Sequence, residues 1–223
     1  IAFGEQAVAL AREAHDDETL AYALYHLAIP MQVQSPERAV ALHDEARALF
    51  QLTRDAWGEA LCTVYGGIPL SFSPAHQVAA QSRLSEGRQR FVALGDSWGS
   101  SVGDQYLGIM ALRRGDLVQA QAHADEVMRV ADEANDGYRI AMVHQQMGRI
   151  ALAGGRHDRA LEHYLQAAEI NARQGRLGYA TQLLLPLARL TVRRGEHRLA
   201  ARLFGAGSVD RGPILRPMFL PDE

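Results

Sequence analysis

The sequence contains no lysine and only one cysteine, and none of its apolar runs is long enough to cross a bilayer. Without lysine, a phosphate-binding loop of the Gly-x-x-x-x-Gly-Lys-Ser/Thr type cannot form. The single cysteine, Cys62, excludes an internal disulfide framework. No charged segment followed by an apolar one opens the chain, so we expect no signal peptide. These absences together favour a cytoplasmic protein that neither spans nor binds a membrane.

The charge balance is close to neutral. All 23 basic residues are arginine, 26 residues are acidic, the net charge is −3 and the isoelectric point is about 6.3. A protein that follows nucleic-acid phosphates needs a basic face, so we expect no direct binding of nucleic acid by this segment. Alanine, by contrast, is abundant, with 36 of 223 residues, and this favours helix.

Three glycines mark a repeat of about 40 residues: Gly115, Gly155 and Gly195. Each has a small residue seven positions before it and an alanine five positions after it. The small residues are Gly108, Gly148 and Ala188, and the alanines are Ala120, Ala160 and Ala200. Short side chains let two antiparallel helices approach closely, so we expect the first two small residues to lie opposite the first two alanines. The repeated glycines are predicted to end a helix with a positive φ.

Each unit is predicted to form two amphipathic helices. The first helices are expected over 17–31, 57–71, 98–112, 138–152 and 178–192, and the second over 36–53, 76–94, 117–134, 157–174 and 197–207. No segment alternates apolar and polar residues convincingly, so no strand is expected. The predicted fold class is all-α, a right-handed superhelical solenoid of helix-turn-helix repeats.

The repeat also predicts the domain organisation. Residues 1–207 are expected to form a single solenoid domain, with helix pairs over 17–53, 57–94, 98–134, 138–174 and 178–207. Glu13-Ala14-His15-Asp16 aligns with Glu133-Ala134-Asn135-Asp136, three periods later, so residues 1–14 are predicted to be a second helix without its first. We therefore expect the chain to be a piece of a longer protein. Three prolines predict an irregular tail over 208–223.

These positions resemble the signature of the tetratricopeptide repeat, in a variety of about 40 residues with long helices. The likeness rests on the small residue before the turn, the turn glycine and the following alanine, and it covers about residues 1–207. The proline that often ends each unit of that family is absent. The resemblance implies a non-enzymatic scaffold that binds a protein or peptide partner.

Two segments carry a narrower resemblance. Arg198-Leu199-Ala200-Ala201-Arg202-Leu203-Phe204-Gly205-Ala206 and Leu94-Gly95-Asp96-Ser97-Trp98-Gly99 are similar to the repeat regions of large bacterial transcriptional regulators. Those regulators carry a STAND-type ATPase and often a LuxR-type helix-turn-helix. The resemblance implies a signal-sensing module whose partners include the regulator's own other domains. A stand-alone peptide-sensing regulator and a pure scaffold remain alternatives, and a homodimer stays open.

One motif points to catalysis. Gly95-Asp96-Ser97-Trp98-Gly99 fits the Gly-x-Ser-x-Gly nucleophile elbow of α/β-hydrolases, which needs a strand before it. Here the preceding residues continue a helix, and alanine replaces the serine one unit earlier. We interpret Ser97 as a helix N-cap and keep a hydrolase using Ser97 as a remote alternative. No catalytic residue is predicted.

The nine histidines do not predict a metal site. No His-Glu-x-x-His motif and no i, i+4 histidine pair occurs. His123 and His163 share one repeat phase, as do His157 and His197, and stacked repeats put such residues about 10 Å apart, too far to share one Zn²⁺. His144 is expected to be a hydrogen-bonded core residue and Cys62 a buried apolar one. No cofactor is predicted.

The first helices are expected to line the concave side of the solenoid. Polar residues at their outward positions form the predicted binding site: Gln105, Arg113, Gln145, Arg149, Gln182, Arg189 and Arg193. The earlier units put apolar residues there, namely Ala21, Leu24, Ala28, Val64, Tyr65 and Ile68. Guanidinium groups pair well with carboxylates, so we predict an acidic or C-terminal peptide as the ligand. The alternative interpretation is a solvated arginine face.

Overall fold

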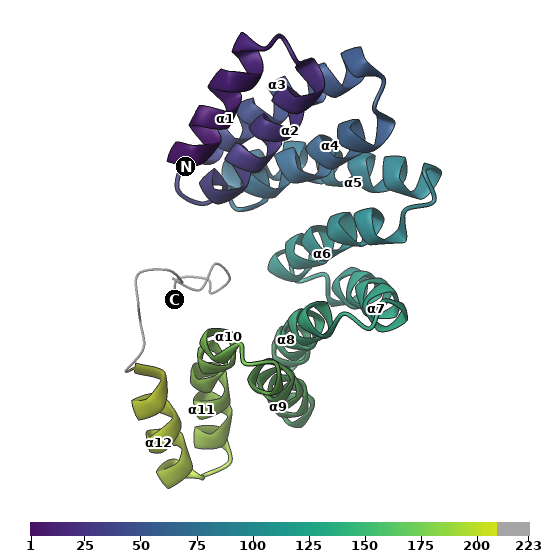
Figure 1. Ribbon diagram of the computed structural model, residues 1–223. Helices are drawn as coiled ribbons and strands as arrows, with labels where there is room; N and C mark the ends of the chain where they lie inside the picture. The colour runs from purple at the N-terminus through teal and green to yellow at the C-terminus, as the bar shows by residue number, and fades with distance from the viewer. Residues whose placement is uncertain (209–223) are drawn as a thin grey trace. The chain divides into compact units, whose positions relative to one another are not determined.

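A computed structural model describes residues 1–208, and within that range every regular element is a helix (Figure 1). The first helices of the pairs are α2 (Asp17–Ala28), α4 (Ala56–Ser71), α6 (Ser97–Arg113), α8 (Gly137–Ala153) and the split helix α10 (Leu177–Gln182) with α11 (Leu184–Arg193). The second helices are α1 (Ala2–Glu13), α3 (Pro36–Thr53), α5 (Gln77–Ala93), α7 (Leu117–Glu133), α9 (His157–Arg173) and α12 (His197–Ser208). Short 3₁₀ turns follow α2 (η1, Ile29–Met31) and α4 (η2, Pro74–His76).

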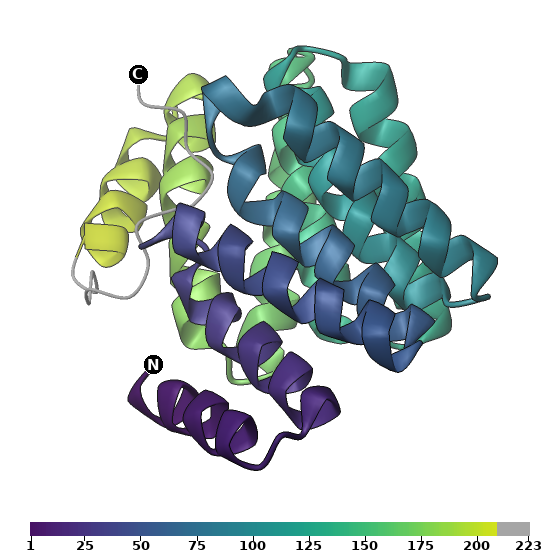
Figure 2. The same cartoon turned by 90° about the horizontal axis from the view of Figure 1, so that it is seen from above.

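Consecutive helices pack against one another, which confirms the predicted all-α helical-repeat class. Contacts divide the chain into a unit of residues 1–130 and a second unit that begins at residue 131, inside α7. In the first unit each of the helices α1 to α5 contacts the next one along the chain, and Figure 2 shows α1 at the edge of this group. In the second unit α9 contacts α8, α10 and α11, and α11 contacts α12. The single domain over 1–207 and the right-handed superhelix stay predictions.

The helix bounds lie within a few residues of those predicted, except that the helix expected over 178–192 is divided at Leu183 into α10 and α11. Pro186 lies in the first turn of α11, where a proline is tolerated. The predicted irregular tail lies outside the described residues, apart from Ser208, which ends α12. No helix of the described range is long and apolar enough to span a membrane.

In each repeat that another pair follows, a residue with positive φ comes shortly after the end of the second helix. These residues are His15, Arg54, Gly95, Asn135 and Gly175, with φ between 50° and 71°. The turns inside the units use glycine as predicted, at Gly115, Gly155 and Gly195. A positive φ costs glycine little, because it has no Cβ. The left-handed residue after each second helix was not predicted, because at three of the five positions it is not a glycine.

An aspartate caps the helix that follows most of these junctions. The carboxylates of Asp16, Asp55, Asp96 and Asp136 accept hydrogen bonds from main-chain N–H groups in the first turns of α2, α4, α6 and α8. Such a cap satisfies donors that the helix itself cannot pair. The prediction that Ser97 is the N-cap of its helix is wrong: Asp96 holds that position, and Ser97 is the first helical residue.

Glycines allow close helix crossings where aromatic rings meet them. A Cβ on Gly58 would lie 2.4 Å from the ring of Phe50, and one on Gly99 would lie 2.3 Å from the ring of Phe91. Gly148 lies against the ring of Tyr164, as its Cβ would be 2.8 Å from that ring. The expected pairing of Gly148 with Ala160 stays a prediction. Large side chains, not only alanines, fill the space that these glycines leave.

Candidate interaction surface and polar clusters

Arg113, one of the seven predicted groove residues, holds the end of another helix. Its Nη1 donates to the main-chain oxygen of Ser71, 2.8 Å away at the end of α4, and its guanidinium lies 5.3 Å from the ring centre of Phe72. The ring of Tyr106 meets Phe72 edge to face at 6.3 Å. Burial lowers the pKa of Arg113. Arg113 thereby supplies a donor to a carbonyl that α4 leaves unpaired; a role in partner binding stays a prediction.

Five other predicted residues lie in the second unit. Gln145 and Arg149 belong to α8, Gln182 ends α10, and Arg189 and Arg193 belong to α11. The first three are half-buried, whereas Arg189 and Arg193 are exposed. Their three helices all belong to the group around α9. Gln105, in α6 of the first unit, is also half-buried.

Of the six apolar residues predicted to line the same groove, five are buried and Tyr65 is half-buried. Ala21, Leu24, Ala28, Val64 and Ile68 are all at most 1% exposed. All of these except Ala28 belong to the core cluster of the first unit, together with the fully buried rings of Phe50 and Phe91. The expectation was wrong because α2 and α4 have neighbours on both sides, so their apolar faces pack against other helices.

Charge is distributed unevenly between the two units. Residues 1–130 hold 10 arginines and 16 acidic residues, whereas residues 131–208 hold 11 arginines and 7 acidic residues. The described part of the second unit is therefore positive although the whole chain is negative. A surface with this balance attracts acidic partners and repels basic ones.

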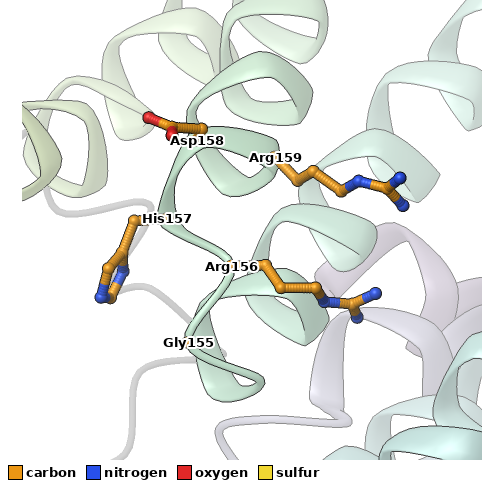
Figure 3. A pocket seen from close by; sticks show the side chains of 5 residues that line it. All are labelled: Gly155, Arg156, His157, Asp158 and Arg159. Atoms are coloured by element: carbon orange, nitrogen blue, oxygen red, sulfur yellow. The ribbon is translucent and has the colours of Figure 1, made fainter.

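A shallow depression at the α8–α9 turn holds part of that positive charge. Gly155, Arg156, His157, Asp158 and Arg159 line it, and its volume is about 330 Å³ (Figure 3). Arg156 and Arg159 extend to one side of the turn, and His157 and Asp158 point to other sides. Because these side chains do not converge on one point, the depression does not form a catalytic site.

A buried ionic cluster in the first unit was not predicted. Asp104 in α6 is 1% exposed, and both of its carboxylate oxygens accept from Nε of Arg88 at 2.8 Å. Nδ1 of His123 in α7 lies 2.7 Å from the same carboxylate. A buried carboxylate needs such partners, because an unpaired charge in the interior is costly. The cluster thus fixes how α5, α6 and α7 meet.

The second unit contains a histidine pair at the equivalent positions, one repeat later. Nδ1 of His144 in α8 lies 3.1 Å from Nδ1 of His163 in α9. Burial lowers the pKa of both imidazoles, and the charge of the neighbouring His163 lowers the pKa of His144 further. His144 is hydrogen-bonded as predicted, although half-buried. The shared spacing of 19 residues between 104 and 123 and between 144 and 163 was the signal that sequence reasoning overlooked.

His43 and Cys62 are buried without obvious chemistry. His43 is fully buried against Tyr25 and Tyr65, and neither of its ring nitrogens has a hydrogen-bond partner among the described residues. Burial lowers the pKa of His43 to about 4. Burial also raises the pKa of the Cys62 thiol to about 12, so the thiolate that would act as a nucleophile does not form near neutral pH.

Aromatic residues of several first helices connect neighbouring repeats. Nε1 of Trp57 donates to Asp96, the N-cap of α6, at 2.7 Å. Tyr22, one repeat earlier, donates in the same way to Asp55 at 3.1 Å. In the second unit Tyr138 packs edge to face on Tyr179 at 5.5 Å. These side chains serve the contact between successive helix pairs, and each aspartate both caps a helix and receives the preceding aromatic residue.

Comparison with known proteins agrees with this architecture. Residues 104–173, which run from α6 to α9, match the tetratricopeptide repeat family. The chain contains a tetratricopeptide-repeat region. The match covers roughly a third of the chain, and tetratricopeptide repeats generally mediate binding between proteins and are typically not enzymes. No curated protein matches the chain.

Proposed function

We propose that the chain is a protein-interaction module and that its second unit binds an acidic peptide segment. The observation that carries the proposal is the positive charge balance of residues 131–208, a range that overlaps the matched repeats at 131–173. Arginine suits this role because its planar guanidinium pairs with a carboxylate through two parallel hydrogen bonds. The residues proposed to make these contacts in the second unit are Gln145, Arg149, Gln182, Arg189 and Arg193. In the first unit, Gln105 and Arg113 stay separate predictions.

The biological setting is part of the proposal. The phrases at residues 94–99 and 198–206 resemble bacterial LuxR-type regulators with a STAND ATPase, which supports a signal-sensing module in the cytoplasm. The partner is then an acidic protein segment or another domain of the same regulator. The full reading frame separates this setting from a stand-alone sensor or a scaffold, because an ATPase or a helix-turn-helix encoded beside this chain supports the regulator.

The acidic-peptide proposal is tested with a labelled oligo-glutamate peptide and the double variant Arg149→Ala with Arg189→Ala. We expect the wild-type chain to bind the peptide, with an affinity that falls as salt is added. The double variant should bind at least about tenfold more weakly, since each lost charged contact costs about 1.5–3 kcal/mol.

The matched control is Arg12→Ala with Arg38→Ala, which removes two exposed arginines from the first unit. Both variants lose the same charge, so a nonspecific effect of net charge would weaken binding equally in both. Equal weakening, or unchanged affinity in Arg149→Ala with Arg189→Ala, would sink the proposal.

A further inference from the structure

The histidine pair of the second unit has the spacing of two ligands on one metal ion. His144 and His163 come from the antiparallel helices α8 and α9, and their rings face each other with centres 5.4 Å apart and planes tilted by 31°. Their Nδ1 atoms are 3.1 Å apart. Two nitrogens bound at 2.0–2.1 Å lie about 3.3 Å apart on a tetrahedral ion and about 2.9 Å apart at a right angle. The observed separation falls between these two values.

The protonation state of the pair also suits a metal. An imidazole binds a metal only when its coordinating nitrogen carries no proton. Burial lowers the pKa of both His144 and His163, so both rings are neutral near pH 7. In the absence of a metal, one Nδ1 can donate its proton to the other. Metal binding would therefore replace one hydrogen bond and displace one proton to Nε2.

The surroundings of the pair limit which ions fit. Within residues 1–208, no set of three histidine, cysteine or acidic side chains is arranged to hold a metal, so the pair supplies two protein ligands and solvent completes the coordination. Arg156 and Arg159 lower the pKa of His163 and oppose a cation, whereas Asp132 and Glu162 favour one. Neutral imidazoles select Cu²⁺, Ni²⁺ or Zn²⁺ rather than Ca²⁺ or Mg²⁺, which prefer oxygen.

Comparison with the preceding repeat shows why we place the metal site at this pair and not at the equivalent residues. Its equivalent residues are Asp104 and His123, 19 residues apart as are 144 and 163. There the carboxylate is neutralised by Arg88 and already accepts from both partners, so a cation would have to displace an ion pair. Among residues 1–208, the hydrogen bond found for the pair joins His144 to His163 and involves no arginine.

We propose that His144 and His163 form a two-histidine site for a divalent transition metal, which joins α8 to α9 through their Nδ1 atoms. This site is independent of the peptide-binding proposal. Because one ion bridges two helices, its binding favours the folded state of the second unit.

Titration of the tag-free chain with Zn²⁺, Ni²⁺ and Cu²⁺ tests the site. We expect saturable binding of one ion per chain by calorimetry, with a higher melting temperature in Zn²⁺ and no response to Mg²⁺. His144→Ala and His163→Ala should each weaken binding by about tenfold or more. His123→Ala, which removes the equivalent histidine of the preceding repeat, should leave it unchanged.

Spectroscopy of the unaltered chain keeps the test independent of how well the variants fold. Electron paramagnetic resonance of the Cu²⁺ form should show coupling to two imidazole nitrogens, and far-UV circular dichroism checks that each variant is helical. The proposal is overturned if no saturable binding occurs, if the Cu²⁺ spectrum shows fewer than two imidazoles, or if folded His144→Ala and His163→Ala retain full affinity.

Discussion

At the scale of the residue, the fully buried His43 is expected to make the stability of the folded chain depend on pH. His43 occupies the position that Leu84 takes one repeat later, and both are fully buried. Leu84 shows that an apolar residue can occupy this position of the repeat. Burial lowers the pKa of His43 to about 4, so its imidazole stays neutral in the folded chain.

Because the pKa of His43 is lower in the folded chain than in the unfolded one, we expect the free energy of unfolding to decrease as the pH is lowered from about 6.5 to about 4. In that window the unfolded chain binds a proton at residue 43 and the folded chain does not, so each pH unit costs up to about 1.4 kcal/mol. We expect His43→Leu to lose less stability than the wild type between pH 7 and pH 5. Urea unfolding at the two pH values measures this.

His144 and His163 have lowered pKa values too, so the variant should retain part of the pH dependence. Asp44 and Arg83, which also act on His43, are unchanged in it. An identical loss of stability in His43→Leu and the wild type would show that His43 titrates normally in the folded chain.

The polar clusters were the part of the molecule that residue patterns did not predict. The helix positions followed from glycine and alanine spacing, because those residues act locally in turns and crossings. The contact of Arg88 with Asp104 and of His144 with His163 depends on which faces of two helices meet. From a single sequence, this register can be predicted only by comparing both members of a pair with the equivalent positions of the next repeat.

At the scale of the helix, the aspartates before the first helices are the main local signal. Asp96 accepts from the N–H of Gly99 at 2.8 Å and from Nε1 of Trp57 at 2.7 Å. Asp96 therefore stabilises both the start of α6 and the contact between α6 and α4.

We expect Asp96→Ala to lower the free energy of unfolding by about 1–2 kcal/mol, because the cap and a hydrogen bond are both lost. Ser97→Ala is the matched control. It alters the next residue, which is exposed and does not cap the helix, so its effect should stay within about 0.5 kcal/mol. Chemical denaturation of both variants decides the point, and a larger effect at Ser97 than at Asp96 would contradict it.

The prediction of an apolar half of the groove was wrong at this same scale. The periodicity of α2 and α4 correctly indicated helices with apolar faces, but it could not show that neighbours cover those faces on both sides. α4 and α6 each bury residues almost all round, as central helices of a stack do.

At the scale of the whole molecule, stability should vary along the chain. In helical repeats each unit is stabilised mainly by its neighbours, so helices at the ends of the array open most easily. α4 and α6 each bury many residues, whereas α1 buries only Val8 and Ala11.

We therefore expect amide hydrogens of α1 and α12 to exchange fastest and those of α4 and α6 slowest. Hydrogen–deuterium exchange with mass spectrometry measures the order directly. Uniform protection over residues 1–208 would mean that the chain opens in one cooperative step, contrary to this expectation.

The junctions between pairs have a consequence for how such a chain changes length in evolution. Four of the five consist of a residue with positive φ followed by an aspartate that caps the next helix, as in Gly95–Asp96 and Asn135–Asp136. Deletion of residues 96–135 would join Gly95 to Asp136 and recreate the same junction with one helix pair fewer. Unequal recombination at these points can add or remove a whole repeat without creating a new turn, so only the side chains that newly meet would have to adapt.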